Sequence, residues 1–488
     1  MAELFTEDDV RKLIATAVAE AVAPLLARIK EQDEEIARLK AEIARLKKDS
    51  STSSKPPSSD IIKKQRPKPP GGNKRRKRKR GGQPGHQRNM RTPFLSEQVD
   101  ETWIYEWEES TLGPEWEPLD QFRTLQQVEL VEKLFKVTAH RARLYRSRIT
   151  GNVIAVPLPK EVKRAGLIGP RLTALLAFQK GACHMSYTTI QTFLKDVLSL
   201  PISTGQIAKI VQKASAALAS CHAELQAALP TQSYLDIDET GHPENGKRMW
   251  SWGFHSPGSR GFTWFHIDPS RSTEVLYAFL TETFSGIISC DYYSVYQKFL
   301  KETSAFMQFC WAHLIRDVKF LTTLSDPVCR RYGEKLLAEI KKLFRVWHGR
   351  DEMPKAKWER AAMKAKDAVI RQARRAPQRT DPQNMAERFR KHAKYYFTFL
   401  HVDGVEPTNN AMEQKMRFLA IDRKITQGTR GERGRRWCER MWTLLATGVQ
   451  QGRSAFKFLY QSLLAYFQNR PAPSLLLPPH DGHFNPST

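Results

Sequence analysis

Three acidic residues that lie far apart in the sequence have the types and positions expected of a metal-dependent catalytic site. Asp238 ends an apolar, strand-like run that begins at Tyr234, Asp291 directly follows the apolar strand predicted at 287–290, and Glu413 lies early in a helix-forming segment. Carboxylates at the ends of core elements can converge on Mg²⁺, which prefers carboxylate oxygens and keeps several waters. Two such ions stabilise the attacking and leaving oxygens of an in-line phosphoryl displacement. The pattern therefore indicates metal-assisted phosphoryl transfer.

Each acid also has a simpler structural interpretation. Asp291 could cap a helix, and Asp238 could belong to a turn. Glu413 stands three residues after Asn410, which is the spacing of a capping box, and four residues before Arg417, which is the spacing of a helical ion pair. The residue pattern alone leaves these alternatives open.

The elements around the three acids follow a mixed α/β order. Three short strands linked by Gly and Pro turns are predicted at 234–238, 248–255 and 261–267. They are followed by a strand at 287–290, a helix at 292–300, a strand at 306–311 and a helix from about residue 313. This order is compatible with a ribonuclease-H-like fold that carries a long helical insertion over 319–400 and further helices at 407–421 and about 436–467. Within the first strand, period two places Asp236 on the same face as Asp238.

A pair of helices upstream of this region resembles a DNA-binding motif. Segments 186–198 and 206–218 are amphipathic, and the turn between them, 201–205, contains Gly205. Helix, turn and helix in this order are compatible with a helix that reads DNA. Short helix pairs are also common in protein cores, so both interpretations stay open.

The N-terminal segment, about 8–48, is predicted to be one helix with a heptad repeat. Its seam consists of Leu25, Ile29, Gln32, Ile36, Leu39, Ile43 and Leu46. Ile at a and Leu at d favour a parallel dimer, and the flanking pairs Arg28–Asp33, Glu35–Lys40 and Glu42–Lys47 are opposite in charge. The alternative is an amphipathic helix that packs on its own domain.

Basic residues dominate the composition. The 488 residues include 78 Lys and Arg against 52 Asp and Glu, a net charge of +26. Half of this excess lies in the Ser- and Pro-rich linker 51–91, which has 14 Lys and Arg and one acid. Its centre is the unbroken run Lys74, Arg75, Arg76, Lys77, Arg78, Lys79 and Arg80. A disordered arm of this composition is suited to neutralising phosphates, so nucleic acid is the expected partner, although a solvated linker without a specific role is the alternative.

Several classes of protein are disfavoured by the same sequence. No apolar run approaches the ~18 residues of a membrane helix, and the N-terminus lacks the regions of a signal peptide. Six scattered Cys residues form no CxxC pair, which disfavours a disulfide scaffold or a Cys-rich zinc module. A soluble protein of a reducing cytoplasm, with no membrane partner, is expected.

Seven motifs in a fixed order give a more specific indication. They are Ser53–Asp60, Gly81–His86, Asp238–Gly241, Cys310–His313, Thr408–Glu413, Arg423–Lys424 and Gly428–Gly431. In this order the chain resembles the insertion-sequence-66 family of bacterial DDE transposases. The resemblance extends from the heptads to about Leu459.

The resemblance implies a ribonuclease-H-like catalytic domain in which Asp238, Asp291 and Glu413 form the acidic triad and hold two Mg²⁺ ions, with Mn²⁺ as a substitute. Cys310 and His313 match a Cys-x-x-His motif that would support the active site rather than bind zinc, since only two ligands are available there. Further support is expected from Asn410, Arg423 and Lys424. The resemblance also implies DNA ends and target DNA as partners, helper proteins encoded by the same element, and a nucleoid-associated location in a bacterial cytoplasm.

The sequence departs from the family pattern in three places. Relatives carry paired cysteines after the basic linker, whereas residues 87–182 contain no Cys, so zinc is not expected. Asp291 is followed by Tyr292, where Gly is frequent in the family, and Glu413 is followed by Gln414, where Arg is usual.

These observations predict a domain organisation and a function. The predicted parts are a coiled-coil dimerisation helix (1–50), a disordered basic linker (51–92), a small β-rich domain (93–160) with a hairpin turn at 150–152, a helix-turn-helix-like DNA-binding region (161–230), the first part of the catalytic core (231–318), a helical insertion (319–400), the last part of the core (401–469) and a disordered tail (470–488). The predicted function is DNA transposition. A catalytically silent DNA-binding dimer and a nuclease without strand transfer are the alternatives.

Overall fold

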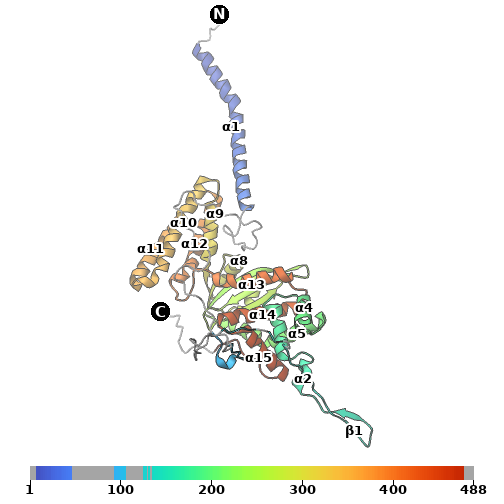
Figure 1. Cartoon of the computed structure of the whole chain (residues 1–488). Helices are drawn as coiled ribbons and strands as arrows, with labels where there is room; N and C mark the ends of the chain where they lie inside the picture. Colours follow the sequence, from blue (N-terminus) through green and yellow to red (C-terminus); the bar gives the residue numbers. More distant parts are fainter. Residues whose placement is uncertain (1–6, 47–92, 106–124, 129, 132–133, 478–488) are drawn as a thin grey trace, which may run out of the picture. The chain divides into compact units, whose positions relative to one another are not determined.

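The structure is a computed structural model that describes residues 7–46, 93–105, 125–128, 130–131 and 134–477 (Figure 1). The linker predicted at 51–92, with its basic run 74–80, lies outside the described residues. Among the described helices, none is both long and apolar enough to cross a membrane.

The N-terminal helix α1 spans Glu7–Leu46, close to the predicted limits. Pro24 lies inside it and cannot donate a backbone hydrogen bond, and the heptad seam begins at the next residue. The seam is solvent-exposed in the single chain, with Ile36 46% and Ile43 49% exposed. Dimerisation through this seam therefore stays a prediction.

The segment 93–160 differs from its prediction. A hairpin does form around the predicted turn, with β1 (Leu144–Arg146) antiparallel to β2 (Val153–Ala155). These are the only strands among the described residues of 93–160, and none of the described side chains there is buried. Two three-residue strands cannot cover an apolar face. The described residues therefore do not form the small β-rich domain that was expected.

The centre of the molecule is a mixed five-stranded sheet. Its strands are β3 (Tyr234–Glu244), β4 (Lys247–His255), β5 (Thr263–Asp268), β6 (Ile287–Cys290) and β7 (Phe306–Phe309). The order across the sheet is β5-β4-β3-β6-β7. Strands β3, β4 and β5 pair antiparallel, whereas β3, β6 and β7 pair parallel. The predicted sequence of three antiparallel strands followed by strand–helix–strand–helix thus agrees with the observed elements.

Strand β3 is longer than predicted. It continues past Asp238 to Glu244, and its register with β4 ends at the pair Glu244 and Lys247. Asn245 and Gly246 form the connecting turn with φ of +46° and +78°, the conformation of a two-residue hairpin in which Asn-Gly is favoured. Asp238 therefore lies within a strand and does not belong to a turn.

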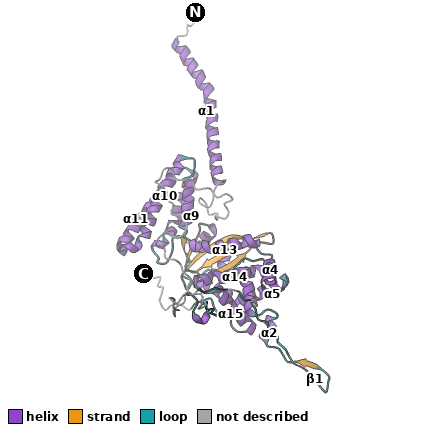
Figure 2. Ribbon diagram, in the orientation of Figure 1, coloured by secondary structure: helices purple, strands orange, loops and turns teal. Residues whose placement is uncertain are grey.

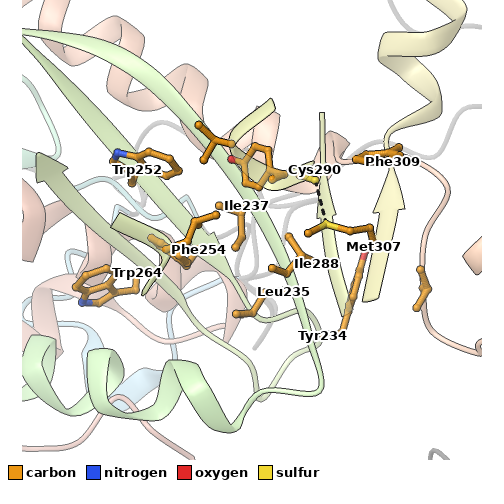
Figure 3. Close-up of a cluster of buried hydrophobic side chains, with 14 of the residues drawn as sticks. Tyr234, Leu235, Ile237, Trp252, Phe254, Trp264, Ile288, Cys290, Met307 and Phe309 are labelled. Atoms are coloured by element: carbon orange, nitrogen blue, oxygen red, sulfur yellow. Dashed lines mark hydrogen bonds between the residues drawn. The ribbon is translucent and has the colours of Figure 1, made fainter. Parts of the chain in front are cut away.

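Both faces of the sheet are buried, and side chains alternate between two cores. Leu235, Ile237 and Ile288 are fully buried in the larger core, which also contains Trp264 (Figure 3). The next residue on β5, Phe265, belongs to the second core. There Met412, Met416 and Leu419 of α13 and Trp442 of α14 cover the opposite face.

One group of helices lies between and after the strands of the sheet (Figure 2). They are α7 (Thr273–Leu280), α8 (Ser294–Glu302), α9 (Trp311–Leu321), α13 (Asn410–Thr426), α14 (Glu432–Gln450) and α15 (Ala455–Gln468). Helix α13 contacts β3 and β4, and α14 contacts β5.

The remaining helices lie before the sheet and between α9 and α13. The first group is α2 (Lys160–Ala165), α3 (Pro170–Gly181), α4 (Tyr187–Leu198), α5 (Thr204–Ala217), α6 (Ala219–Ala228) and the 3₁₀ turn Leu229–Thr231. The second group, in the predicted insertion, is α10 (Pro327–His348), α11 (Lys355–Arg374), α12 (Thr380–His392) and the 3₁₀ turns Arg350–Glu352, Ala393–Tyr396 and Thr398–Leu400.

The prediction of a disordered tail from residue 470 is wrong for its first residues. Leu475 is buried in the larger core, with 1% of its surface exposed. Gln451 donates from Nε2 to the Leu475 carbonyl at 2.8 Å, and Arg453 donates to the Ser474 carbonyl at 3.1 Å. The buried Leu475 side chain and the two hydrogen bonds that its backbone and that of Ser474 accept order this segment despite its proline content. Residues 478–488 lie outside the described part of the chain.

Candidate active site

The sheet places the two predicted aspartates side by side. Strands β3 and β6 are parallel neighbours, and their register pairs Asp236 with Ser289. Two residues further along each chain are Asp238, still within β3, and Asp291, directly after β6. The carboxyl end of β6 therefore brings Asp291 next to β3, as expected where an open α/β sheet presents its ligands.

Helix α13 brings the third acid to this edge of the sheet. The Asn409 side chain donates from Nδ2 to the Ile237 carbonyl at 2.8 Å and fixes the start of α13 against β3. Gly253 of β4 pairs with Asp238, and a Cβ atom at Gly253 would overlap the end of the Met412 side chain. The missing side chain thus permits the close approach of α13, whose first turn carries Glu413.

At this edge of the sheet, Asp291 and Glu413 lie close enough to Asp238 for their charges to act on it. The pKa of Asp238 is raised well above its usual value, first by burial and then by the charges of Glu239, Asp291 and Glu413. Burial and the charge of Glu239 also raise the pKa of Asp291, to about 7. A group of neighbouring carboxylates, in which the charges of some raise the pKa of another, is a favourable environment for a cation. The donor set is all oxygen, so the residues present fit a hard divalent ion.

Glu239 is a buried acid next to Asp238 that the sequence analysis did not single out. Its Oε1 accepts hydrogen bonds from Arg271 Nε at 2.8 Å and Nη2 at 2.6 Å, and its Oε2 accepts one from Tyr296 Oη at 2.5 Å. The Arg271 guanidinium also lies 4.0 Å from the centre of the Tyr293 ring. Both oxygens of Glu239 are occupied by donors of this chain, which suits a supporting role rather than a ligand role. Its position inside the Asp-Glu-Thr motif was the available signal.

Glu413 lies between two residues of α9. Its Oε2 accepts a hydrogen bond from Arg316 Nη2 at 3.2 Å, and its Oε1 lies 3.7 Å from His313 Nδ1. Helix α13 begins at Asn410, and its N-cap residue Asn409 makes no side-chain capping bond. The described ion pairs of Glu413 are with α9 and not with Arg417. The capping-box and helical ion-pair interpretations of Glu413 are therefore not the observed ones.

Asp291 is not the N-cap residue of the following helix, α8, but it orders the segment that leads into this helix. Its Oδ1 accepts a hydrogen bond from the Tyr293 backbone amide at 3.0 Å, and Tyr293 is the N-cap residue of α8. The aspartate thus orders the approach to α8 while its charge still acts on Asp238.

Asp236 is buried, with 3% of its surface exposed, and accepts a hydrogen bond from Tyr234 Oη at 2.8 Å. Burial raises its pKa to about 6. It lies near Asp238 along β3, but its principal polar contact is within the strand.

The residues that were predicted to support the active site differ in their burial and in their hydrogen bonds. Cys310 is the N-cap residue of α9, directly after β7, and its buried Sγ accepts a hydrogen bond from the Asn409 amide at 3.2 Å. Arg423 donates to Thr240 Oγ1 at 2.8 Å and also to the Gly241 carbonyl. Asn410, by contrast, is exposed. The neighbouring residue Asn409 is the one whose side chain contacts β3, through its hydrogen bond to the Ile237 carbonyl.

The helix-turn-helix-like segment contains α4 and α5, each with a serine cap. Ser186 accepts a hydrogen bond from the Thr189 amide, and Ser203 accepts one from the Gln206 amide. Helix α5 also packs against α3, α14 and α15, so one of its faces belongs to the core. Lys209 lies on its exposed side.

Comparison with known protein families identifies the class of protein to which the chain belongs. A transposase family model, described as transposase IS66 family, matches residues 165–436. Because this match covers more than half of the chain, the chain belongs to the IS66 family of transposases. Membership implies DNA binding and a DNA-processing enzyme, and DDE transposases generally use divalent metals. Residues 5–92 match a second family, described as a family of unknown function. Among curated proteins, none matches the chain.

Proposed function

We propose that this protein cuts DNA at the ends of its own mobile element and joins those ends to target DNA, with Asp238, Asp291 and Glu413 as its catalytic carboxylates. The observation that carries this proposal is the convergence of the three acids. Asp238 lies in the middle of β3, Asp291 directly follows β6 and Glu413 lies in the first turn of α13; the charges of Asp291 and Glu413 contribute to the raised pKa of Asp238. The strand order β5-β4-β3-β6-β7 supports the ribonuclease-H-like catalytic domain that the proposal includes.

The three carboxylates would hold two divalent ions, Mg²⁺ or Mn²⁺. When bound, such ions stabilise negative charge on the attacking and leaving oxygens of an in-line displacement at phosphorus. The surrounding residues prepare the carboxylates for this role. Arg271 balances the charge of Glu239, whereas Asp238 and Asp291 keep raised pKa values. Arg316 holds one oxygen of Glu413 and thereby fixes its orientation.

The reaction consists of two exchanges of phosphorus–oxygen bonds. Water first attacks a phosphodiester at the element end, which breaks one P–O bond and frees a 3′-hydroxyl. That hydroxyl then attacks a target phosphodiester and displaces another 3′-oxygen. Each step forms one P–O bond and breaks one, so no covalent bond between protein and DNA is required.

The other parts of the chain would supply DNA binding and assembly. The basic run 74–80 would neutralise phosphates without reading sequence, and α4 and α5 would contact the element ends. The seam of α1 would pair two copies. We retain the predicted division into domains, except for the hairpin segment 93–160 and the ordered start of the tail. Helper proteins of the same element and a location at the bacterial nucleoid complete the proposal.

The test is a supercoiled plasmid that carries the element ends, incubated with the protein, Mg²⁺, target DNA and the helper proteins. We expect cleaved ends and a joined product, and we expect neither with Asp291→Asn. Asp236→Asn is the matched control and should retain both products, because Asp236 is hydrogen-bonded within β3. Cleavage without joining would identify a nuclease. Binding of the ends without cleavage would identify a silent DNA-binding dimer. Either result would overturn the proposal.

A further inference from the structure

The first turns of two helices, α9 and α13, lie close together beside the proposed catalytic site and bring three different metal-ligand types together. The Trp311 amide at the start of α9 donates to the Pro407 carbonyl at 2.9 Å, which connects α9 to the segment leading into α13. Cys310 and His313 come from the start of α9, and Glu413 comes from the first turn of α13. One ligand atom of each, the Cys310 Sγ, a His313 ring nitrogen and a Glu413 carboxylate oxygen, lies within 4.8 Å of the others.

Two of these residues carry buried polar atoms without a partner. Among the described residues, no group forms a hydrogen bond to His313 Nδ1 or to Glu413 Oε1. The two atoms face each other at 3.7 Å, which is too long for a direct hydrogen bond. His313 has only 8% of its surface exposed. Buried polar atoms without partners are costly, so an additional group between them would stabilise the arrangement.

We propose that Cys310, His313 and Glu413 bind a zinc-class divalent ion. Thiolate, imidazole and carboxylate are ligands of Zn²⁺, which often takes three protein ligands and an open fourth position. Mg²⁺ does not favour a thiolate, so this site is distinct in its chemistry from the all-oxygen site of Asp238 and Asp291. A thiolate and a carboxylate together also balance the two charges of the ion in a buried place.

The third ligand explains why the sequence did not indicate this site. Cys310 and His313 are three residues apart, and two ligands alone are insufficient for a zinc site. Glu413 is a hundred residues further along the chain, and only the contact between α9 and α13 adds it to the set.

The proposed ion site and the proposed catalytic site share Glu413. Arg316 already holds Oε2 of this residue, so an ion bound with Cys310 and His313 would use Oε1. This ion would then compete with the catalytic ions for the Glu413 carboxylate, and occupancy would reduce cleavage. This consequence, unlike the binding itself, rests on the proposed function.

The experiment is a titration of the full-length, reduced protein with Co²⁺, which reports zinc sites by its absorption. We expect one equivalent to give a thiolate-to-cobalt charge-transfer band and the intense visible bands of tetrahedral coordination, both abolished by Zn²⁺, which binds more tightly. Cys310→Ser should remove the charge-transfer band, and His313→Gln should weaken Co²⁺ binding by more than about 100-fold, since even outer-shell changes cost 10–100-fold.

Two kinds of control make the result decisive. Cys329→Ser changes a buried cysteine of α10 and should leave the band unchanged. Asp238→Asn and Asp291→Asn should also keep the band although they abolish cleavage, so the ion site and the catalytic proposal can fail separately. Circular dichroism checks that each variant is folded. The inference is overturned if no charge-transfer band forms, or if the band persists in Cys310→Ser.

Discussion

The aliphatic rows of helix α1 and of the central sheet are similar in composition but opposite in environment. Ile36 and Ile43 of α1 are 46% and 49% exposed, whereas Leu235, Ile237 and Ile288 of the sheet are fully buried by their own chain. The sheet therefore completes its core within one copy. The seam of α1 is exposed in the single chain, and we predict that a second copy buries it, as in other heptad helices.

Because of this difference, apolar residues in the two regions are expected to contribute to different properties of the protein. A residue of the sheet contributes to the stability of the single chain, because its burial removes apolar surface from water, at about 25 cal/mol per Å². A residue of the seam contributes to association. The same chemical change should therefore have different consequences in the two regions.

The largest effect is expected in the sheet. Ile288→Asp places a carboxylate in the larger core without an ion-pair partner, and we expect a loss of more than about 4 kcal/mol in the free energy of unfolding. Urea denaturation followed by circular dichroism measures it. Ile421→Asp is the matched control, because Ile421 on α13 is 51% exposed. Equal destabilisation by both changes would contradict the burial argument.

The next effect is expected in the seam. Ile36→Asp should weaken self-association by at least about 100-fold because a charge enters the apolar interface, while the urea transition of the sheet domain stays unchanged. Sedimentation of the full-length chain at micromolar concentration measures the mass. Ala37→Asp adds the same charge next to the seam and should leave the dimer intact. A monomeric parent chain would show that α1 has another role.

A smaller effect is expected from pH. Burial lowers the pKa of His222 from 6.5 to about 4, and its Nε2 lies 3.0 Å from the Phe265 carbonyl. As pH falls from 6.5 to about 4, the unfolded chain takes up a proton that the folded chain does not, so stability decreases across this window. His222→Gln should make this decrease smaller, by up to about 3 kcal/mol. Urea midpoints at pH 7 and pH 4.5 test it; an unchanged pH dependence would contradict the assignment.

The smallest effect on the folded chain is expected from the basic run, which lies outside the described residues. Replacing Lys74–Arg80 with Ser and Gly should leave the stability unchanged, weaken binding to all duplexes alike and flatten its salt dependence. Fluorescence anisotropy with element-end and unrelated duplexes, at several salt concentrations, measures this. A loss confined to the element ends would mean that the run reads sequence.

Local patterns in the sequence predicted helices and strands well where neighbouring residues alone determine the element. The buried run Ile287–Cys290 is the strand β6, and Ser186 caps the helix that was predicted to begin there. Strand β3 ends later than predicted because the Asn245–Gly246 turn, and not a break after Asp238, terminates it; Asn-Gly is a strong hairpin signal.

The site was predictable only in part, for a physical reason. Asp238, Asp291 and Glu413 follow recognisable motifs, and the sheet and α13 bring their charges together. The residues that hold the neighbouring acids in place, Arg271 and Arg316, come from a loop and a helix without a motif of their own. Contacts between distant segments leave no periodicity in the sequence, and neither does the burial of Leu475.

The central claim is that Glu413 acts as a catalytic carboxylate together with Asp238 and Asp291. The most direct test compares the initial rates at which Glu413→Gln, Asp236→Asn and the parent protein cleave a supercoiled plasmid with element ends in Mg²⁺. The account predicts that Glu413→Gln loses at least about 10³-fold in rate, since the amide keeps the shape but not the charge, while end binding is retained. Asp236→Asn should cleave nearly as fast as the parent. Cleavage by Glu413→Gln at the parental rate would contradict the account and reduce Glu413 to a structural partner of Arg316.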